Sequence, residues 1–304
     1  MPSTSDIITG VKNPQLFGRY INRILGDLIP KWNNQHQGVD FMEEDWDNLV
    51  LLDACRFDAF ADENNIPGEL EYRHSKGCAT PEFLETNFGS KELHDTVYIT
   101  ANGKIAALSD TITAEFHSVI PLFSEEWDDS MGVVPPERVT ERALEEASKF
   151  PNKRVIVHYV QPHIPFIGAD TQPDKQTILD DNIDQIFWMR VLTGEIDLSK
   201  DELWDAYIKT LRVTLPHVRE LADGLEGKTV ISADHGNAFG ERARPIPVRE
   251  WGHPAGVYME ELTKVPWLIQ EGERKEITPE APVNSELEFD EREVVDQLRH
   301  LGYR

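Results

Sequence analysis

Residues 229–236 have the sequence Thr-Val-Ile-Ser-Ala-Asp-His-Gly, in which a short, largely apolar run ends in a carboxylate, an imidazole and a glycine. Three further runs of this character lie at 48–53, 97–100 and 155–160. Such runs are typical of strands buried on both faces of a parallel sheet. Stretches with helical spacing lie at 14–28, 136–150, 202–225 and 291–301. The alternation predicts an α/β fold with a mostly parallel central β-sheet flanked by helices.

The composition limits the class of protein. The chain has 304 residues with 55 Asp and Glu against 30 Lys and Arg, which gives a formal net charge of −25. Its 39% hydrophobic residues are enough to build a core of one large domain or two small ones. Because so acidic a surface repels phosphates, we expect no nucleic-acid partner. The excess of carboxylates is also typical of halophilic proteins.

The number of cysteines and the length of the apolar segments indicate the cellular compartment of the protein. Cys55 and Cys78 are too few for a disulfide scaffold or a four-cysteine zinc site, which favours a reducing compartment. The sequence has no signal-peptide core and no run of about 18 apolar residues. We therefore expect a cytoplasmic protein.

Polar side chains follow the apolar runs. Asp53 ends the first run, His163 follows the third, and Asp234 and His235 follow the fourth. Ligands of open α/β sheets bind at the carboxyl ends of the strands, so these groups are expected at one edge, with His253 as a further imidazole. A mixed Asp and His set suits Zn²⁺ or Mn²⁺ better than Ca²⁺ or Mg²⁺, which remain alternatives.

Several segments resemble the alkaline phosphatase and sulfatase superfamily. Residues 232–241, Ser-Ala-Asp-His-Gly-Asn-Ala-Phe-Gly-Glu, are similar to its DHG…GE signature, and residues 253–269 resemble its later histidine segment and "VP" strand. Residues 161–166, Gln-Pro-His-Ile-Pro-Phe, resemble the His-x-Pro segment of sulfatases, lipoteichoic acid synthase and phosphoethanolamine transferases. Residues 301–303, Leu-Gly-Tyr, resemble a common sulfatase-like ending. The resemblance spans 46–303, implies a three-layer α/β/α fold and, with the acidic composition, suggests a haloarchaeal type.

The resemblance implies roles for individual residues. Asp53, Asp234 and His235 match the acidic and imidazole ligands of one metal ion. His163 and His253 match histidines that hold the substrate phosphate or help to bind a second metal.

The nucleophile is expected within residues 74–83, His-Ser-Lys-Gly-Cys-Ala-Thr-Pro-Glu-Phe. Thr80 precedes the helix-starting Pro81, so it can lie at the positive end of that helix with its oxygen on the metal. Its alternative role is a simple N-cap. Cys78 is the rival, but the formylglycine signature C/S-x-P-S-R is not matched, because proline comes one place late and no Ser-Arg follows.

For three further residues, a purely structural role is an alternative to a role in catalysis or binding. Arg56 either reaches substrate oxyanions or pairs with Asp58 or a helix acid. His158 lies inside an apolar strand and is expected to pack in the core. Glu241 matches a glutamate that is usually structural.

The implied activity is that of a metal-dependent hydrolase or transferase acting on phosphate esters or diesters through a covalent threonine intermediate. Thr80 would be the nucleophile and a metal ligand, with His163, His253 and Arg56 assisting. The ester would be a small molecule or linked to a glycan or lipid. The alternatives are a sulfatase acting on sulfate esters and a non-catalytic binding module that retains the fold.

We divide the chain into residues 1–40, an amphipathic helix and linker, and 41–304, the catalytic domain. Residues 11–32 hold four basic residues and one acidic residue. The helix must bury its apolar face, either against the catalytic domain or a second subunit of a homodimer, or at a membrane surface near lipid-linked substrates. That face comprises Phe17, Tyr20, Ile21, Ile24, Leu25 and Leu28.

Overall fold

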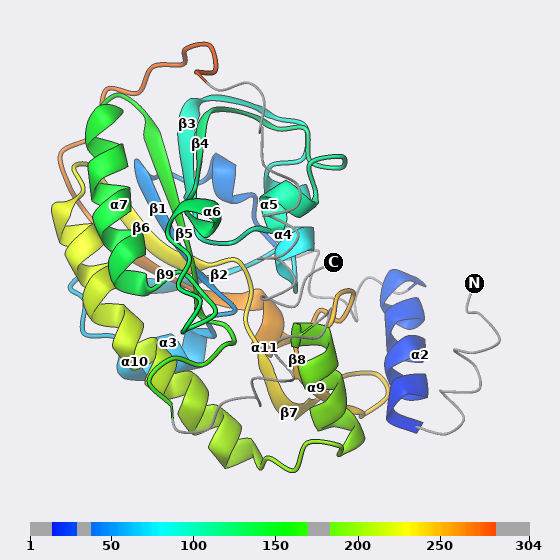
Figure 1. Ribbon diagram of the computed structural model, residues 1–304. Helices are drawn as coiled ribbons and strands as arrows, with labels where there is room; N and C mark the ends of the chain where they lie inside the picture. Colours follow the sequence, from blue (N-terminus) through cyan, green and yellow to red (C-terminus); the bar gives the residue numbers. More distant parts are fainter. Residues whose placement is uncertain (1–13, 29–37, 170–182, 284–304) are drawn as a thin grey trace.

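A seven-stranded sheet with the order β2-β9-β6-β1-β5-β3-β4 forms the centre of the protein (Figure 1). The computed structural model describes residues 14–28, 38–169 and 183–283. Strands β4, β3, β5, β1 and β6 are parallel, whereas β9 runs antiparallel to β6 and β2 antiparallel to β9. The strands are β1 Asn48–Asp53, β2 Glu69–His74, β3 Glu92–Thr100, β4 Glu115–Pro121, β5 Arg154–Pro162, β6 Thr229–Ala233 and β9 Lys264–Gln270.

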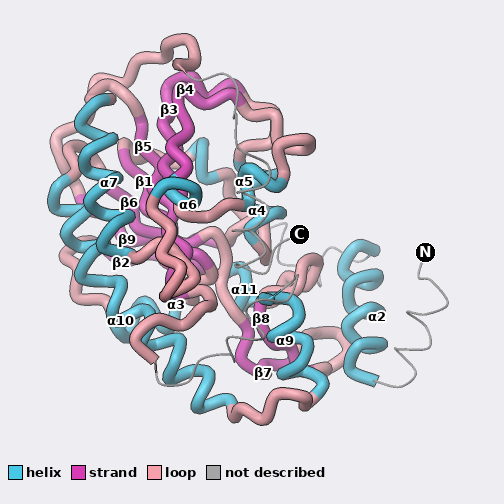
Figure 2. Tube along the Cα trace, viewed as in Figure 1, coloured by secondary structure: helices cyan, strands magenta, loops and turns pink. Residues whose placement is uncertain are grey.

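Helices cover both faces of this sheet, and a small hairpin lies outside it (Figure 2). Helices α7 and α10 pack on each other and on β5, whereas α4 and α5 lie on the opposite side (Figure 1). The helices are α2 Pro14–Leu28, η3 Phe41–Glu43, α3 Phe57–Glu63, α4 Thr80–Asn87, α5 Lys104–Ala107, α6 Leu122–Glu125, α7 Pro136–Lys149, α9 Ile183–Thr193, α10 Lys200–Gly224 and α11 Glu260–Thr263. The hairpin consists of β7 Ala238–Arg242 and β8 Arg249–Gly252.

The predicted α/β class and its mostly parallel sheet are confirmed. Every residue of β1 and β6 is buried, as expected for strands covered on both faces. The predicted strands coincide with β1, with parts of β3 and β5, and with β6, while the helices expected at 136–150 and 202–225 are α7 and α10. Strand β2 has a half-exposed, charged pattern, so it lacked an apolar signal. The helix expected at 291–301 and the motif at 301–303 lie outside the described residues.

Helix α2 forms as predicted and contacts the body of the protein, but three residues of its apolar face stay exposed, so the membrane-surface and homodimer alternatives remain predictions. It lies beside the β7–β8 hairpin, away from the main sheet (Figure 1). Phe17, Tyr20 and Ile24 of its apolar face are 53%, 38% and 37% exposed. Polar side chains make the contacts with the body of the protein instead, because a buried glutamate on β8 needs a cationic partner.

A helix that crosses a bilayer needs about 20 predominantly apolar residues. Within the described ranges, no helix is both long enough and apolar enough to cross a membrane.

Candidate metal centre

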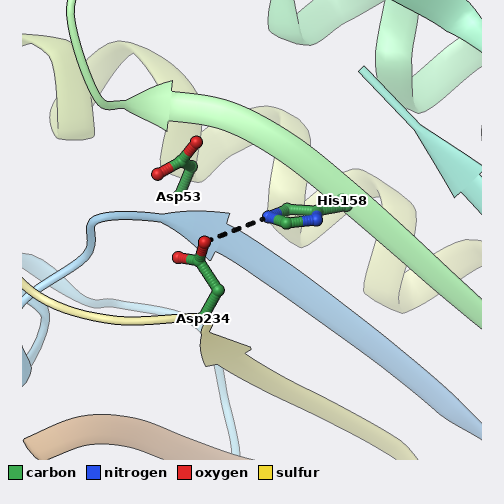
Figure 3. A group of neighbouring side chains, drawn as sticks. All are labelled: Asp53, His158 and Asp234. Atoms are coloured by element: carbon green, nitrogen blue, oxygen red, sulfur yellow. Dashed lines mark ion pairs between the residues drawn. The ribbon is translucent and has the colours of Figure 1, made fainter. Parts of the chain in front are cut away.

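Two carboxylates at the carboxyl ends of β1 and β6 meet one imidazole from the middle of the adjacent strand β5. Asp53 ends β1, Asp234 directly follows β6, and His158 lies on β5, on the other side of β1. One ligand atom of each lies within 4.8 Å of the other two, and all three side chains are fully buried (Figure 3). Parallel strands end at the same edge of a sheet, so the register brings these groups together. The cluster has the donors of a divalent-cation site.

His235 and Thr80 adjoin the same cluster. His235 Nε2 lies 3.5 Å from Asp53 Oδ1 and 3.4 Å from Asp234 Oδ2. The Thr80 hydroxyl donates a 2.8 Å hydrogen bond to Asp234 Oδ2, and its oxygen lies 3.3 Å from His235 Nε2. The structure therefore brings together the four residues that the sequence assigned to one metal ion, while metal binding itself stays a prediction.

Hydrogen bonds from the Asn102 side chain and from the surrounding backbone orient these groups. The Asn102 amide donates to Asp53 Oδ2 at 2.6 Å, and the backbone N–H groups of Ala54 and His235 donate to Asp234 Oδ1 at 3.1 and 2.8 Å. His235 Nδ1 donates to the carbonyl oxygen of Gly236 at 2.8 Å, since a carbonyl can only accept. This tautomer leaves a lone pair on Nε2 that faces the carboxylates, which is the arrangement of a metal-ligating histidine.

The ionisation states fit the same interpretation. Burial lowers the pKa of His235 to about 4, although Asp234 favours the charged ring, so the imidazole is neutral near pH 7. Burial opposes ionisation of Asp234, but the hydrogen bonds from the Thr80 hydroxyl and the Ala54 N–H group favour its charged form, and its pKa lies below the usual range. Buried carboxylates beside neutral imidazoles are a donor set that Zn²⁺ or Mn²⁺ fits.

His158 is fully buried inside β5, as predicted, and it also faces the carboxylate cluster, which the sequence did not indicate. Its Nδ1 lies 2.8 Å from the Tyr98 hydroxyl, and its Nε2 lies 3.7 Å from Asp234 Oδ2. That Nε2 atom is buried and has no hydrogen-bond partner among the described residues. Its position inside an apolar strand gave no signal, because the strand order decides which side chains it meets. Burial also lowers the pKa of His158, which keeps the ring neutral.

His163 and His253 lie next to this cluster, as the sequence predicted. Their Nε2 atoms are 3.0 Å apart, and the rings of His253 and His235 have centroids 4.5 Å apart. His163 Nδ1 donates to the carbonyl oxygen of Ile164 at 2.6 Å, so its Nε2 accepts a hydrogen bond from His253. His163 is buried, whereas His253 is half-buried and lies nearer to the solvent.

The two candidate nucleophiles differ in their surroundings. Thr80 is the first residue of α4, after the N-cap Ala79, and is only 1% exposed, so it is not an exposed N-cap. Cys78 donates its S–H to Glu82 Oε2 at 2.9 Å. Burial and the Glu82 carboxylate raise the pKa of Cys78 well above its usual value, which keeps the thiol protonated and poorly nucleophilic. The geometry therefore favours Thr80.

Arg56 makes structural ion pairs. Its guanidinium contacts Asp58 at 2.5 Å and Glu241 at 3.0 Å and lies 5.0 Å from the centre of the Trp204 ring. Glu241 also pairs with Lys200 at 3.1 Å. These contacts favour the structural alternative for Arg56 over oxyanion binding and agree with a structural Glu241.

Comparisons with known proteins give similarity in fold only. No protein-family model matches the sequence, and no curated protein matches it significantly. Similar solved structures include the periplasmic domain of phosphoethanolamine transferase EptC from Campylobacter jejuni, 15% identical over 73% of this chain and 78% of that one, with a TM-score of 0.45. EptC from Escherichia coli in complex with zinc is 14% identical over 83% and 79%, with a TM-score of 0.46. An alkaline phosphatase superfamily protein from Vibrio parahaemolyticus is 14% identical over 88% and 69%, with a TM-score of 0.45.

Proposed function

We propose that this protein is a metal-dependent phosphoesterase or phosphotransferase that acts through Thr80. The observation that carries the proposal is the buried contact of the Thr80 hydroxyl with Asp234 and His235, at the N-terminus of α4. The helix N-terminus and a bound cation both favour a negatively charged oxygen at this position.

The chain holds donors for one divalent cation in Asp53, His158, Asp234 and His235, with Thr80 as an additional oxygen ligand. Zn²⁺ or Mn²⁺ is the cation that we propose, since the donors are mixed oxygen and nitrogen. When bound, such a cation lowers the pKa of a coordinated hydroxyl and neutralises charge on a phosphoryl group.

The residues then have the following proposed roles. Thr80 Oγ1 attacks phosphorus while its proton passes to the Asp234 carboxylate that accepts its hydrogen bond, and the ester P–O bond breaks. His253 gives a proton to the leaving alcohol, and His163, in contact with His253, holds that ring in place. Water or an acceptor alcohol then attacks the phosphothreonine and gives its proton to His253, the P–Oγ1 bond breaks, and Thr80 regains its proton from Asp234.

Trapping the covalent intermediate tests the proposal. The protein is loaded with Zn²⁺ or Mn²⁺ and assayed with an aryl phosphate, an aryl phosphodiester and an aryl sulfate. We expect turnover of a phosphate substrate and, after acid quenching, an intact mass increased by one phosphoryl group on the peptide that contains Thr80.

Three variants sharpen this test. Thr80→Ala should lose both turnover and the label, and Thr80→Ser should keep both at a reduced rate. Thr86→Ala, on the same helix, removes a hydroxyl that donates to the helix backbone and accepts a long 3.5 Å hydrogen bond from the Asn87 amide, far from the cluster's own contacts, and it should behave like the unmodified protein. Turnover without a label on Thr80 would contradict the covalent mechanism, whereas metal binding without any turnover would favour a binding module.

A further inference from the structure

The segment that carries His253 lies outside the main sheet. His253 follows β8 directly, and among the described strands β8 pairs with β7 alone, in the two-stranded hairpin. Asp53, Asp234 and His163 come from the ends of central strands, which the ladders of the seven-stranded sheet hold in place. On its C-terminal side this segment is held by Glu82, which accepts a 2.8 Å hydrogen bond from the Gly256 N–H group, whereas on its N-terminal side the position of His253 depends on what packs on the hairpin.

Helix α2 makes a set of polar contacts with this hairpin. The Arg19 guanidinium pairs with the carboxylate of Glu250 on β8, with Nη2 and Nε at 2.5 and 2.6 Å from Oε2. The Asn22 side chain donates to the backbone oxygen of Ile246 and accepts from its N–H group, both at 2.8 Å. A paired donor and acceptor of this kind fixes both distance and orientation.

Close backbone approach supports the same contact. A Cβ atom on Gly18 would lie 2.3 Å from a methyl group of Val248, so only glycine allows α2 to come this near. On the other side of the hairpin, a Cβ atom on Gly252 would lie 2.4 Å from the Trp188 ring of α9. The strand that leads to His253 is thus held between two helices.

The Arg19–Glu250 pair is a largely buried ion pair between α2 and the hairpin. The Glu250 side chain is fully buried, three residues before His253, and the Arg19 side chain is only 13% exposed. Burial raises the pKa of Glu250, and Arg19 opposes this effect. A buried carboxylate that loses its cation is strongly unfavourable, so without Arg19 the Glu250 side chain would take up a proton or the hairpin would move to let water reach it, and either change removes the ion pair that ties α2 to β8.

From these contacts we propose that α2 is a positioning element of the active site, in which Arg19 and Asn22 hold the β7–β8 hairpin so that His253 stays in contact with His163 and His235. The proposal rests on the proposed function for the role of His253 in turnover. It assigns α2 to the catalytic unit, although Phe17, Tyr20 and Ile24 of its apolar face are exposed.

Side-chain NMR tests the positioning directly, without any substrate. Imidazole signals are recorded for the full chain, with His253 and His163 assigned from His253→Gln and His163→Gln. In Arg19→Gln we expect the His253 signals to shift or broaden and those of His163 to follow, while His94, on β3, stays unchanged. In Phe17→Ser, an exposed position on the same helix, all of these signals should stay in place. Unchanged His253 signals in folded Arg19→Gln would overturn the proposal.

Kinetics and rescue separate positioning from general loss of structure. In Arg19→Gln we expect kcat to fall about 10- to 100-fold with KM changed much less, because displacing a catalytic group by about 1 Å can cost this much. The double variant Arg19→Gln with Glu250→Gln replaces the ion pair by two neutral amides and should recover both kcat and the His253 signals. If the double variant is as impaired as Arg19→Gln, the ion pair does not act through the hairpin. If no substrate is turned over at all, the proposed function fails, while the NMR result still decides the positioning.

Discussion

Replacing Asp53 by Asn should raise the free energy of unfolding of the metal-free protein. It should also remove the stabilisation that the protein gains from added metal. Asp53 and Asp234 are both fully buried, and their ligand atoms lie within 4.8 Å of each other. At this separation two like charges repel by about 3 kcal/mol at an effective dielectric constant of about 20. The Asn102 amide keeps its acceptor in Asp53→Asn, so the substitution loses little hydrogen bonding.

Denaturant unfolding with a chelator and with excess Zn²⁺ measures both effects. The unmodified protein should gain about 2.7 kcal/mol when the free metal concentration is about 100 times the dissociation constant. Asp53→Asn should lose most of this gain, because removing a ligand is expected to cost more than the roughly 10- to 100-fold in affinity that outer-shell changes cost.

Asp47→Asn is the matched control for this experiment. Asp47 is equally buried and lies directly before β1, but it accepts hydrogen bonds from Arg274 at 2.8 and 3.1 Å. Burial opposes the charge on Asp47, yet the bonds from Arg274, Lys228 and Lys275 outweigh it and lower its pKa. Asp47→Asn should therefore destabilise the protein and leave the metal response intact. The cluster is not a metal site if Asp53→Asn destabilises as much as Asp47→Asn and retains the full Zn²⁺ response.

Further outcomes are expected for substitutions of Cys78, of Lys275 and of two exposed residues on α2. Cys78→Ser should retain turnover, because the Cys78 thiol points to Glu82; loss of activity in Cys78→Ser with activity kept in Thr80→Ala would reverse the assignment. Burial lowers the pKa of Lys275 to about 8, so between pH 8 and 10.5 the unfolded chain binds the proton that the folded state has released. The stability of the protein relative to Lys275→Met, measured by urea unfolding, should therefore rise over this interval, and a flat difference would contradict the shift. If α2 contacts membranes, anionic vesicles should float the protein, and the double substitution of Phe17 and Tyr20 by Ser should abolish flotation; absence of both forms from the vesicle fraction would exclude this contact.

Local sequence was sufficient to predict the fold class and most of the candidate site. The runs at 48–53 and 229–232 are strands because they are too apolar to lie at a surface, and they are short enough to be parallel strands between helices. Asp53, Asp234 and His235 meet because residues at the carboxyl ends of parallel strands share one edge of the sheet. The shared edge follows from the sequence pattern alone, whereas the close contact of Asp53 with Asp234 also requires that β1 and β6 are neighbours.

The order of the strands and the packing of distant segments were decided only by the tertiary structure. His158 faces Asp234 because β1 lies between β5 and β6, an order that depends on long-range packing and leaves no mark in the local pattern. Likewise, α2 turns its polar side to the protein because Glu250, more than 200 residues away, is buried and requires Arg19. Hydrophobic periodicity predicts that a helix forms and which face is apolar, but a buried charge on another element can outweigh that face when the helix docks.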